Sequence, residues 1–96
     1  MIITVERDGR QAARWGLGIT SAHYVWEKAG ADLRTFDGHK SGECAPLVRD
    51  AVDRILAEPD AFIGVVGYYD LRGTVAALTG LFFTLRECPE GIVRIN

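Results

Sequence analysis

Two tyrosines, a carboxylate and a guanidinium stand together in one short segment of the sequence. The four residues are Tyr68, Tyr69, Asp70 and Arg72. Tyrosine and arginine are among the side chains that most often anchor a binding interface, so the segment predicts a binding patch. Each residue also has a structural interpretation. An aspartate can cap a helix, which is worth about 1 kcal/mol, and tyrosines can pack at the edge of a core with their hydroxyls in water.

Cys44 could do covalent chemistry with its sequence neighbours His39 and Lys40. A cysteine becomes a nucleophile when a base or a positive charge stabilises its thiolate. Nothing in the sequence makes these side chains converge, and free cysteines are more often small buried groups than reactive ones. The isolated thiols Cys44 and Cys88 indicate neither a disulfide scaffold nor a redox pair. They favour a reducing cytoplasm and leave their own redox state open.

Motifs for metals and phosphates are incomplete. One cluster of potential metal ligands consists of Asp37, His39, Glu43 and Cys44. Structural metal sites draw on closely spaced pairs of ligands, so a hydrated loop is the simpler interpretation. The stretch at 38–41 lacks the adjacent Gly-Lys-Ser and the earlier glycine of a phosphate-binding loop. We therefore assign no metal, no cofactor and no catalytic residue.

The charge balance argues against nucleic acid as a partner. The 96 residues include eleven lysines and arginines against thirteen aspartates and glutamates, a formal net charge of −2. Nucleic-acid-binding domains normally carry a basic surplus. Arg7, Arg10 and Arg14 lie near Trp15, which could stack on a base. A charged edge strand that resists aggregation explains the same residues more simply.

The length and the apolar stretches indicate one soluble domain. A chain of 96 residues fits a single domain, residues 1–96. The longest uncharged stretch, residues 73–85, is shorter than the ~20 residues that a helix needs to cross a bilayer. Residues 1–7 show neither the apolar segment nor the cleavage site of a secretory signal. We therefore expect a cytoplasmic protein that has no membrane partner.

The N-terminal half predicts a hairpin followed by a helix and a loop. Alternating residues at 2–7 indicate a strand, and Asp8-Gly9 suits a two-residue turn. Residues 11–18 fit either a return strand or a short helix. An amphipathic helix is expected from Thr20 or Ser21 to Leu33, and residues 34–42 are expected to be a loop.

The C-terminal half predicts a strand between two helices and a further strand at the end. A helix should begin near residues 43–45 and end before Pro59. The uncharged, β-branched run at 61–68 indicates a central strand. A helix over 71–87 and a strand over 92–95 would complete a right-handed parallel crossover. The tyrosine segment would then lie at a strand's carboxyl end and a helix's amino end, where parallel sheets bind ligands.

The predicted fold is a small layered α/β domain. It has about three mostly parallel strands and three helices, and residues 11–18 would add an antiparallel hairpin strand near the N-terminus if they form a strand rather than a helix. In element order and length it resembles the barstar-type fold of small nuclease inhibitors. The recognition motif of that family is absent from the sequence, and a shared fold alone carries little information about function.

Three functions are compatible with these features. The first is a non-enzymatic protein-interaction module, inhibitor- or immunity-like, which binds a protein partner through residues 68–72. The second is a small-molecule-binding protein or minor enzyme with a pocket at the same junction; a concave pocket there would favour it, and a flat aromatic surface would favour the first. The third is a homodimer that pairs through small residues on the last helix, namely Gly73, Ala76, Ala77 and Gly80.

Overall fold

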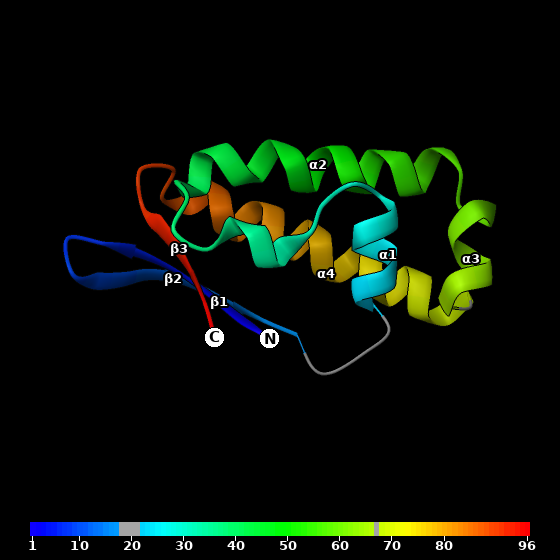
Figure 1. Ribbon diagram of the computed structural model, residues 1–96, viewed down its shortest axis with the longest axis horizontal. Coiled ribbons are helices and arrows are strands. Elements are labelled where there is room, and N and C mark those ends of the chain that lie inside the picture. Colours follow the sequence, from blue (N-terminus) through cyan, green and yellow to red (C-terminus); the bar gives the residue numbers. More distant parts are fainter. Residues whose placement is uncertain (18–21, 67) are drawn as a thin grey trace.

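The part of the chain that the structure describes forms three strands, four α-helices and one short 3-10 helix (Figure 1). The computed structural model describes residues 1–17, 22–66 and 68–96, except for the side chains of residues 22–24, 65, 66 and 68–70. In chain order the elements are β1 (Ile2–Arg7), β2 (Arg10–Gly16), α1 (Ala22–Lys28), the 3-10 helix η1 (Leu33–Phe36), α2 (Ser41–Ala57), α3 (Asp60–Val66), α4 (Tyr68–Glu87) and β3 (Ile92–Ile95).

The predicted N-terminal hairpin is confirmed. β1 pairs with β2 in antiparallel register, from Ile2 opposite Gly16 to Arg7 opposite Arg10 beside the turn. Asp8 and Gly9 adopt φ angles of 54° and 74°, as the favoured two-residue hairpin turn requires. The structure also decides between the two interpretations of residues 11–18, because residues 11–16 are strand and residue 18 lies outside the described residues.

The sheet is antiparallel throughout, so the prediction of mostly parallel strands is wrong. Its order is β2-β1-β3, and β3 runs antiparallel to β1 from Ile3 opposite Ile95 to Glu6 opposite Ile92. The resemblance to the barstar-type fold was one of element order, and that order included a strand at 61–68, where residues 60–66 are helical instead. The described residues form a small α/β arrangement of three antiparallel strands with four α-helices.

The error comes from residues 61–68, which we predicted as the central strand. Residues 60–66 form helix α3, and α4 begins directly at Tyr68. The amides of Phe62 and Ile63 both donate to the carbonyl oxygen of Pro59, as in a first helical turn. A short apolar run bounded by turn residues fits a buried helix as well as a buried strand. With a helix at this position, no parallel crossover forms.

Smaller differences concern the helix ends. The first helix ends at Lys28 rather than Leu33, because Gly30 adopts a left-handed conformation with φ 91° and the Ala31 amide donates back to the carbonyl of Trp26. Asp32 then caps the separate element η1 by accepting from the Arg34 amide at 3.1 Å. Part of the predicted loop at 34–42 is therefore helical, and α2 begins at Ser41. The expected cap at Thr20 or Ser21 lies outside the described residues.

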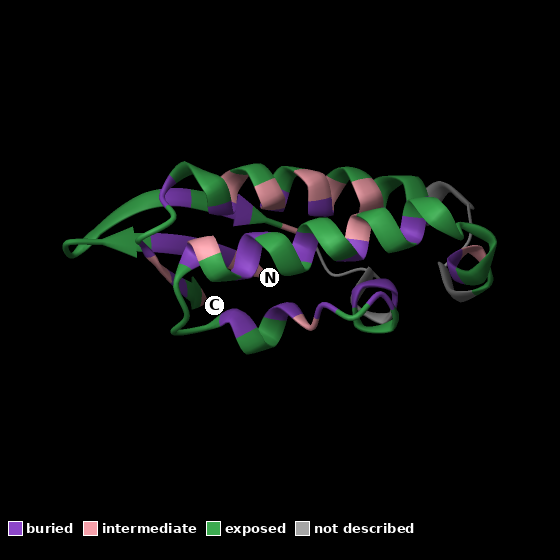
Figure 2. Ribbon diagram, turned by 90° about the horizontal axis from the view of Figure 1, so that it is seen from above, coloured by how far each residue is buried: buried purple, intermediate pink, exposed green. Residues whose placement is uncertain are grey.

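Helices α2 and α4 lie side by side and antiparallel (Figures 1 and 2). At one end the Gly42 amide of α2 donates to the carbonyl of Pro89, just after α4. The sheet, α1 and η1 supply buried side chains to the core on one side of this helix pair. The most deeply buried members of this core are Ile3, Val5, Val25, Leu33, Val48, Ile55, Leu78, Leu81, Leu85 and Val93.

Candidate binding groove

All four residues of the predicted patch lie in the first turns of α4, and of their side chains the structure describes only that of Arg72. The side chains of Tyr68, Tyr69 and Asp70 are outside the described residues. Asp70 is the third residue of α4, so it stands inside the first turn and not at the capping position that we predicted. The strand end that was to form the other half of the site does not exist. Arg72 is exposed and lines a hollow between α2 and α4.

Three hollows follow one another along the outer surface between α2 and α4, and we call this surface the α2–α4 groove. Their volumes are about 340, 180 and 440 Å³. Arg49 and Phe82 line both the second and the third hollow, so these two are continuous. Figure 2 looks down on the two long helices, which lie side by side with no other element over them.

Helical spacing places the lining residues in two facing rows. On α4 the row is Arg72, Val75, Thr79, Phe82 and Arg86, which are separated by three or four positions and therefore share one face. The row on α2 follows the same spacing and consists of Pro46, Arg49, Val52 and Leu56.

The walls of the groove are apolar and partly open to solvent. Leu56 is 62% exposed and Phe83 is 59% exposed, although both are large hydrophobic residues. The rings of Phe82 and Phe83 meet edge to face at 5.5 Å between centroids. Val52 and Val75 are partly buried and pack on the core below. Exposed apolar side chains gathered along one face of a small protein typically mark an interaction site.

Among the described residues that line this surface, three are arginines and one, Asp53, is a carboxylate. Arg49 Nε lies 3.9 Å from Asp53 Oδ2, and both side chains are mostly exposed. The guanidinium of Arg86 lies 5.4 Å from the centre of the Phe82 ring, a cation–π contact. Within the part of the chain that the structure describes, Arg72 forms no ion pair. The groove is therefore apolar along its floor and positively charged along its edges.

Sequence reasoning identified Arg72 and missed the rest of the groove. The sequence of α2 does indicate the groove, because it carries apolar residues at two neighbouring positions in each turn. That stripe is wider than contact with one core requires. Val48 and Ile55 fill the core, whereas Val52 and Leu56 continue the stripe onto the surface.

Two of the four small residues of α4, Ala77 and Gly80, face the protein's own sheet, whereas a side chain added at Gly73 would meet no other atom within 4 Å. The indole Nε1 of Trp15 on β2 donates to the carbonyl oxygen of Ala77 at 2.9 Å. A side chain added at Gly80 would meet the same indole at 3.8 Å. These small residues let β2 approach α4, while Ala76 lies on the other side and lines the groove. Trp15 is only 8% exposed, so it is not available to stack on a nucleic-acid base.

The thiol at Cys44 lacks the surroundings of a nucleophile. Cys44 is buried, and burial, with a smaller contribution from the negative charge of Glu43, raises its pKa to about 11. His39 is exposed on the preceding turn. Asp37 accepts a hydrogen bond of 3.0 Å from the Ile95 amide, so it fastens this turn to β3. Among the described residues, no group of three His, Cys, Asp or Glu side chains could hold a metal ion.

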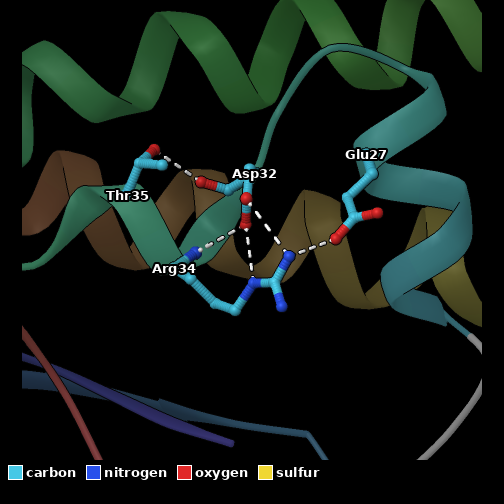
Figure 3. Close-up of polar contacts among 4 residues, drawn as sticks. All are labelled: Glu27, Asp32, Arg34 and Thr35. Carbon is cyan, nitrogen blue, oxygen red and sulfur yellow. Dashed lines mark hydrogen bonds and ion pairs between the residues drawn. The ribbon is translucent and has the colours of Figure 1, made fainter.

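A cluster of polar residues joins α1 to η1 (Figure 3). Arg34 contacts Glu27 on α1 and donates from Nε to Asp32 Oδ1 at 3.0 Å. Thr35 Oγ1 donates to the carbonyl of Asp32 at 2.7 Å. The hydrogen bond from Arg34 lowers the pKa of Asp32 below its usual range. The cluster is exposed and its members satisfy one another, which indicates a structural role.

Comparison with known proteins brings no match: no family model fits the sequence, and neither a curated protein nor a solved structure matches it. Across the described residues, no helix is both long enough and apolar enough to cross a membrane.

Proposed function

We propose that the protein is an interaction module that binds another protein in the α2–α4 groove. The observation that carries this proposal is a row of three hollows along α2 and α4 that combines exposed apolar side chains, chiefly Leu56 and Phe83, with three arginines. Aromatic and arginine side chains supply much of the affinity of protein interfaces. The proposal keeps the interaction module predicted from the sequence but moves its surface from residues 68–72 to the helix pair.

A small ligand is the second candidate, because the hollow beside Arg72 is concave. Its volume of about 340 Å³ and its lining by Ile55, Ile63 and Leu71 would suit an apolar molecule with one carboxylate. Ligand pockets usually measure ~300–1,000 Å³, so this hollow alone is near the lower end. It is also one of three in a row, and a partner that fills the whole groove would bury more apolar surface. Titration with decanoate, followed by NMR, tests this candidate.

Self-association receives less support. In a symmetric pair formed through the groove, the three arginines of one copy would face those of the other, and Asp53 is the only carboxylate among the described residues that line it. Like charges brought together across an interface weaken it. The small-residue face is no better, because Ala77 and Gly80 already contact β2.

Site-specific cross-linking in the cells that make the protein tests the proposal. A photoreactive residue replaces Phe83 in the groove, or Leu47 as a matched control. Leu47 is also on the surface, 49% exposed, but it lies on α2 outside the groove. We expect one defined protein to cross-link from position 83 and not from position 47. Equal cross-linking from both positions, or from neither, would contradict the proposal.

A further inference from the structure

We infer that the occupant of the α2–α4 groove is an amphipathic α-helix of a partner protein, with an apolar face flanked by carboxylates. This inference rests on the proposed function and adds the chemistry of the partner. It follows from the shape of the groove, from the hydrogen bonds that its backbone already forms and from its charges.

The shape of the groove fits a helix. From Arg72 to Arg86 the lining residues of α4 extend over ~21 Å, four helical turns. Hollows arranged in a row along this length can receive side chains from successive turns of a third helix. Such packing of an apolar helix face into a groove is a common mode of peptide recognition.

The backbone of the groove also favours a helix. The amides and carbonyls of α2 and α4 are paired within their own helices, apart from the helix ends and from the position of Pro46, which has no N–H to donate. An extended partner would therefore find no row of free backbone groups to pair with, unlike a strand that adds to the edge of a sheet. A helix satisfies its own backbone and brings only side chains to the surface.

The charges specify the flanks of that helix. Asp53 is already placed against Arg49, which leaves Arg72 and Arg86 as the positive groups at the two ends of the groove. Arginine pairs with carboxylates through two parallel hydrogen bonds, and such bonds strengthen beside apolar surface. The partner helix should therefore carry aspartate or glutamate near both ends of its apolar face.

A membrane surface is a different explanation of arginines beside exposed apolar groups. A helix that lies on a membrane inserts a convex apolar face, whereas Leu56 and Phe83 here border hollows that side chains can enter. The concave surface favours the partner helix, and binding to vesicles becomes an outcome of the test.

The test uses three synthetic peptides of about sixteen residues that share one apolar face, with leucine at every third or fourth position. Their flanking positions carry glutamate, glutamine or lysine. Fluorescence anisotropy measures the binding of each labelled peptide to the full chain. Co-sedimentation with phosphatidylserine–phosphatidylcholine vesicles measures binding to a membrane.

Four variants separate the contributions. Arg72→Ala tests charge in the groove, and Arg10→Ala on β2 is its control because it removes the same charge from an exposed residue elsewhere. Leu56→Ala tests apolar contact in the groove, and Leu47→Ala removes another exposed leucine of α2 that lies outside it. Circular dichroism confirms that each variant folds.

We expect the glutamate peptide to bind most tightly and the lysine peptide most weakly. Arg72→Ala should weaken the glutamate peptide about two- to fivefold, the range of exposed ion pairs, and leave the glutamine peptide unchanged. Leu56→Ala should weaken both peptides, and the two control variants should weaken neither.

Each other result overturns a defined part of the inference. If all three peptides bind equally and Leu56→Ala weakens them all, the acidic chemistry is wrong while the groove remains a protein-binding site. If no peptide binds, or Leu47→Ala has the same effect as Leu56→Ala, the helical partner is wrong, and the cross-linking experiment still tests the proposed function on its own. Binding to anionic vesicles that depends on Leu56 would replace the partner helix with a membrane surface.

Discussion

Ser41 fastens the start of α2 to the end of α4, and its removal should destabilise the protein by a predictable amount. The side chain is fully buried, and its Oγ donates a hydrogen bond of 2.6 Å to the carbonyl oxygen of Leu85. Within α4 that carbonyl would accept from the residue four positions later, which is Pro89 and has no N–H group. The serine hydroxyl thus supplies the donor that the proline lacks.

Ser41→Ala leaves the carbonyl of Leu85 buried without this partner. A buried polar group in that state costs about 1–3 kcal/mol of stability. The hydrogen bond from Gly42 N–H to the Pro89 carbonyl, 2.9 Å long, remains and keeps the two helix ends together. The Leu85 carbonyl therefore cannot turn towards water, and we expect the full loss of stability of about 1–3 kcal/mol.

Thr84→Ala is the matched control. Thr84 Oγ1 also donates to a backbone carbonyl, that of Gly80 at 2.9 Å, but this bond is exposed and lies within one turn of α4. The carbonyl of Gly80 keeps its helical environment when the hydroxyl is removed, and alanine forms helices better than threonine, by up to about 0.7 kcal/mol. We expect the control to have unchanged or slightly increased stability.

Urea unfolding followed by circular dichroism measures both variants. A slope of ~1 kcal/mol per M for a chain of this size converts the expected loss for Ser41→Ala into a midpoint lower by about 1 M or more. The slope itself should not change. If Ser41→Ala and Thr84→Ala shift the midpoint equally, the account of the helix end is refuted.

Three further predictions concern other parts of the fold. Gly91→Ala should lower stability by about 1–3 kcal/mol in the same urea assay. Its new methyl group would overlap Val5 Cγ1 and lie 3.2 Å from the carbonyl oxygens of Glu6 and Cys88. A variant as stable as the wild type would show that this contact is not tight. The depressed pKa of Asp32 means that its ionised form stabilises the fold at neutral pH and that this contribution disappears as the pH falls through the folded-state pKa. Asp32→Asn keeps the cap, so the stability difference from wild type should shrink as the pH falls below about 4, and a constant difference would contradict this. Because the pKa of Cys44 is raised to about 11, iodoacetamide at neutral pH should alkylate Cys44 at least about 100-fold more slowly than a free cysteine. Mass spectrometry locates the label, and rapid alkylation at Cys44 would show that the thiol is accessible and ionised.

The hairpin could be predicted from the sequence because its signals are local. Alternating residues along β1 and the Asp8-Gly9 turn are sufficient to specify two paired strands. Helix α2 could be predicted for a similar reason, because its wide apolar stripe and the proline after its end, Pro59, are features of the sequence alone.

The sheet topology could not be obtained in the same way. An apolar run at 60–66 is compatible with a strand and with a helix, and the choice depends on which partner the run meets in three dimensions. A strand at this position implies a parallel crossover to residues 92–95, so β3 was predicted to run parallel to its neighbour. The structure places α3 there, and β3 pairs with β1 instead.

The groove depends on how two helices pair, which no single segment reveals. Leu56 and Phe83 belong to elements far apart in sequence, and their joint exposure arises only when α2 and α4 lie side by side. Arg72 was singled out for its sequence neighbours, Tyr68 to Asp70. In the structure its described surroundings are instead the apolar side chains of the groove.

An NMR titration of the full chain with the glutamate-flanked peptide tests the central claim most directly. The account predicts that backbone amide signals change along both walls of the groove, at Arg49–Leu56 of α2 and Arg72–Arg86 of α4, while those of the β1–β2 hairpin stay in place. The absence of change at saturating peptide, or changes centred on the hairpin, would contradict the assignment of the groove as the binding surface.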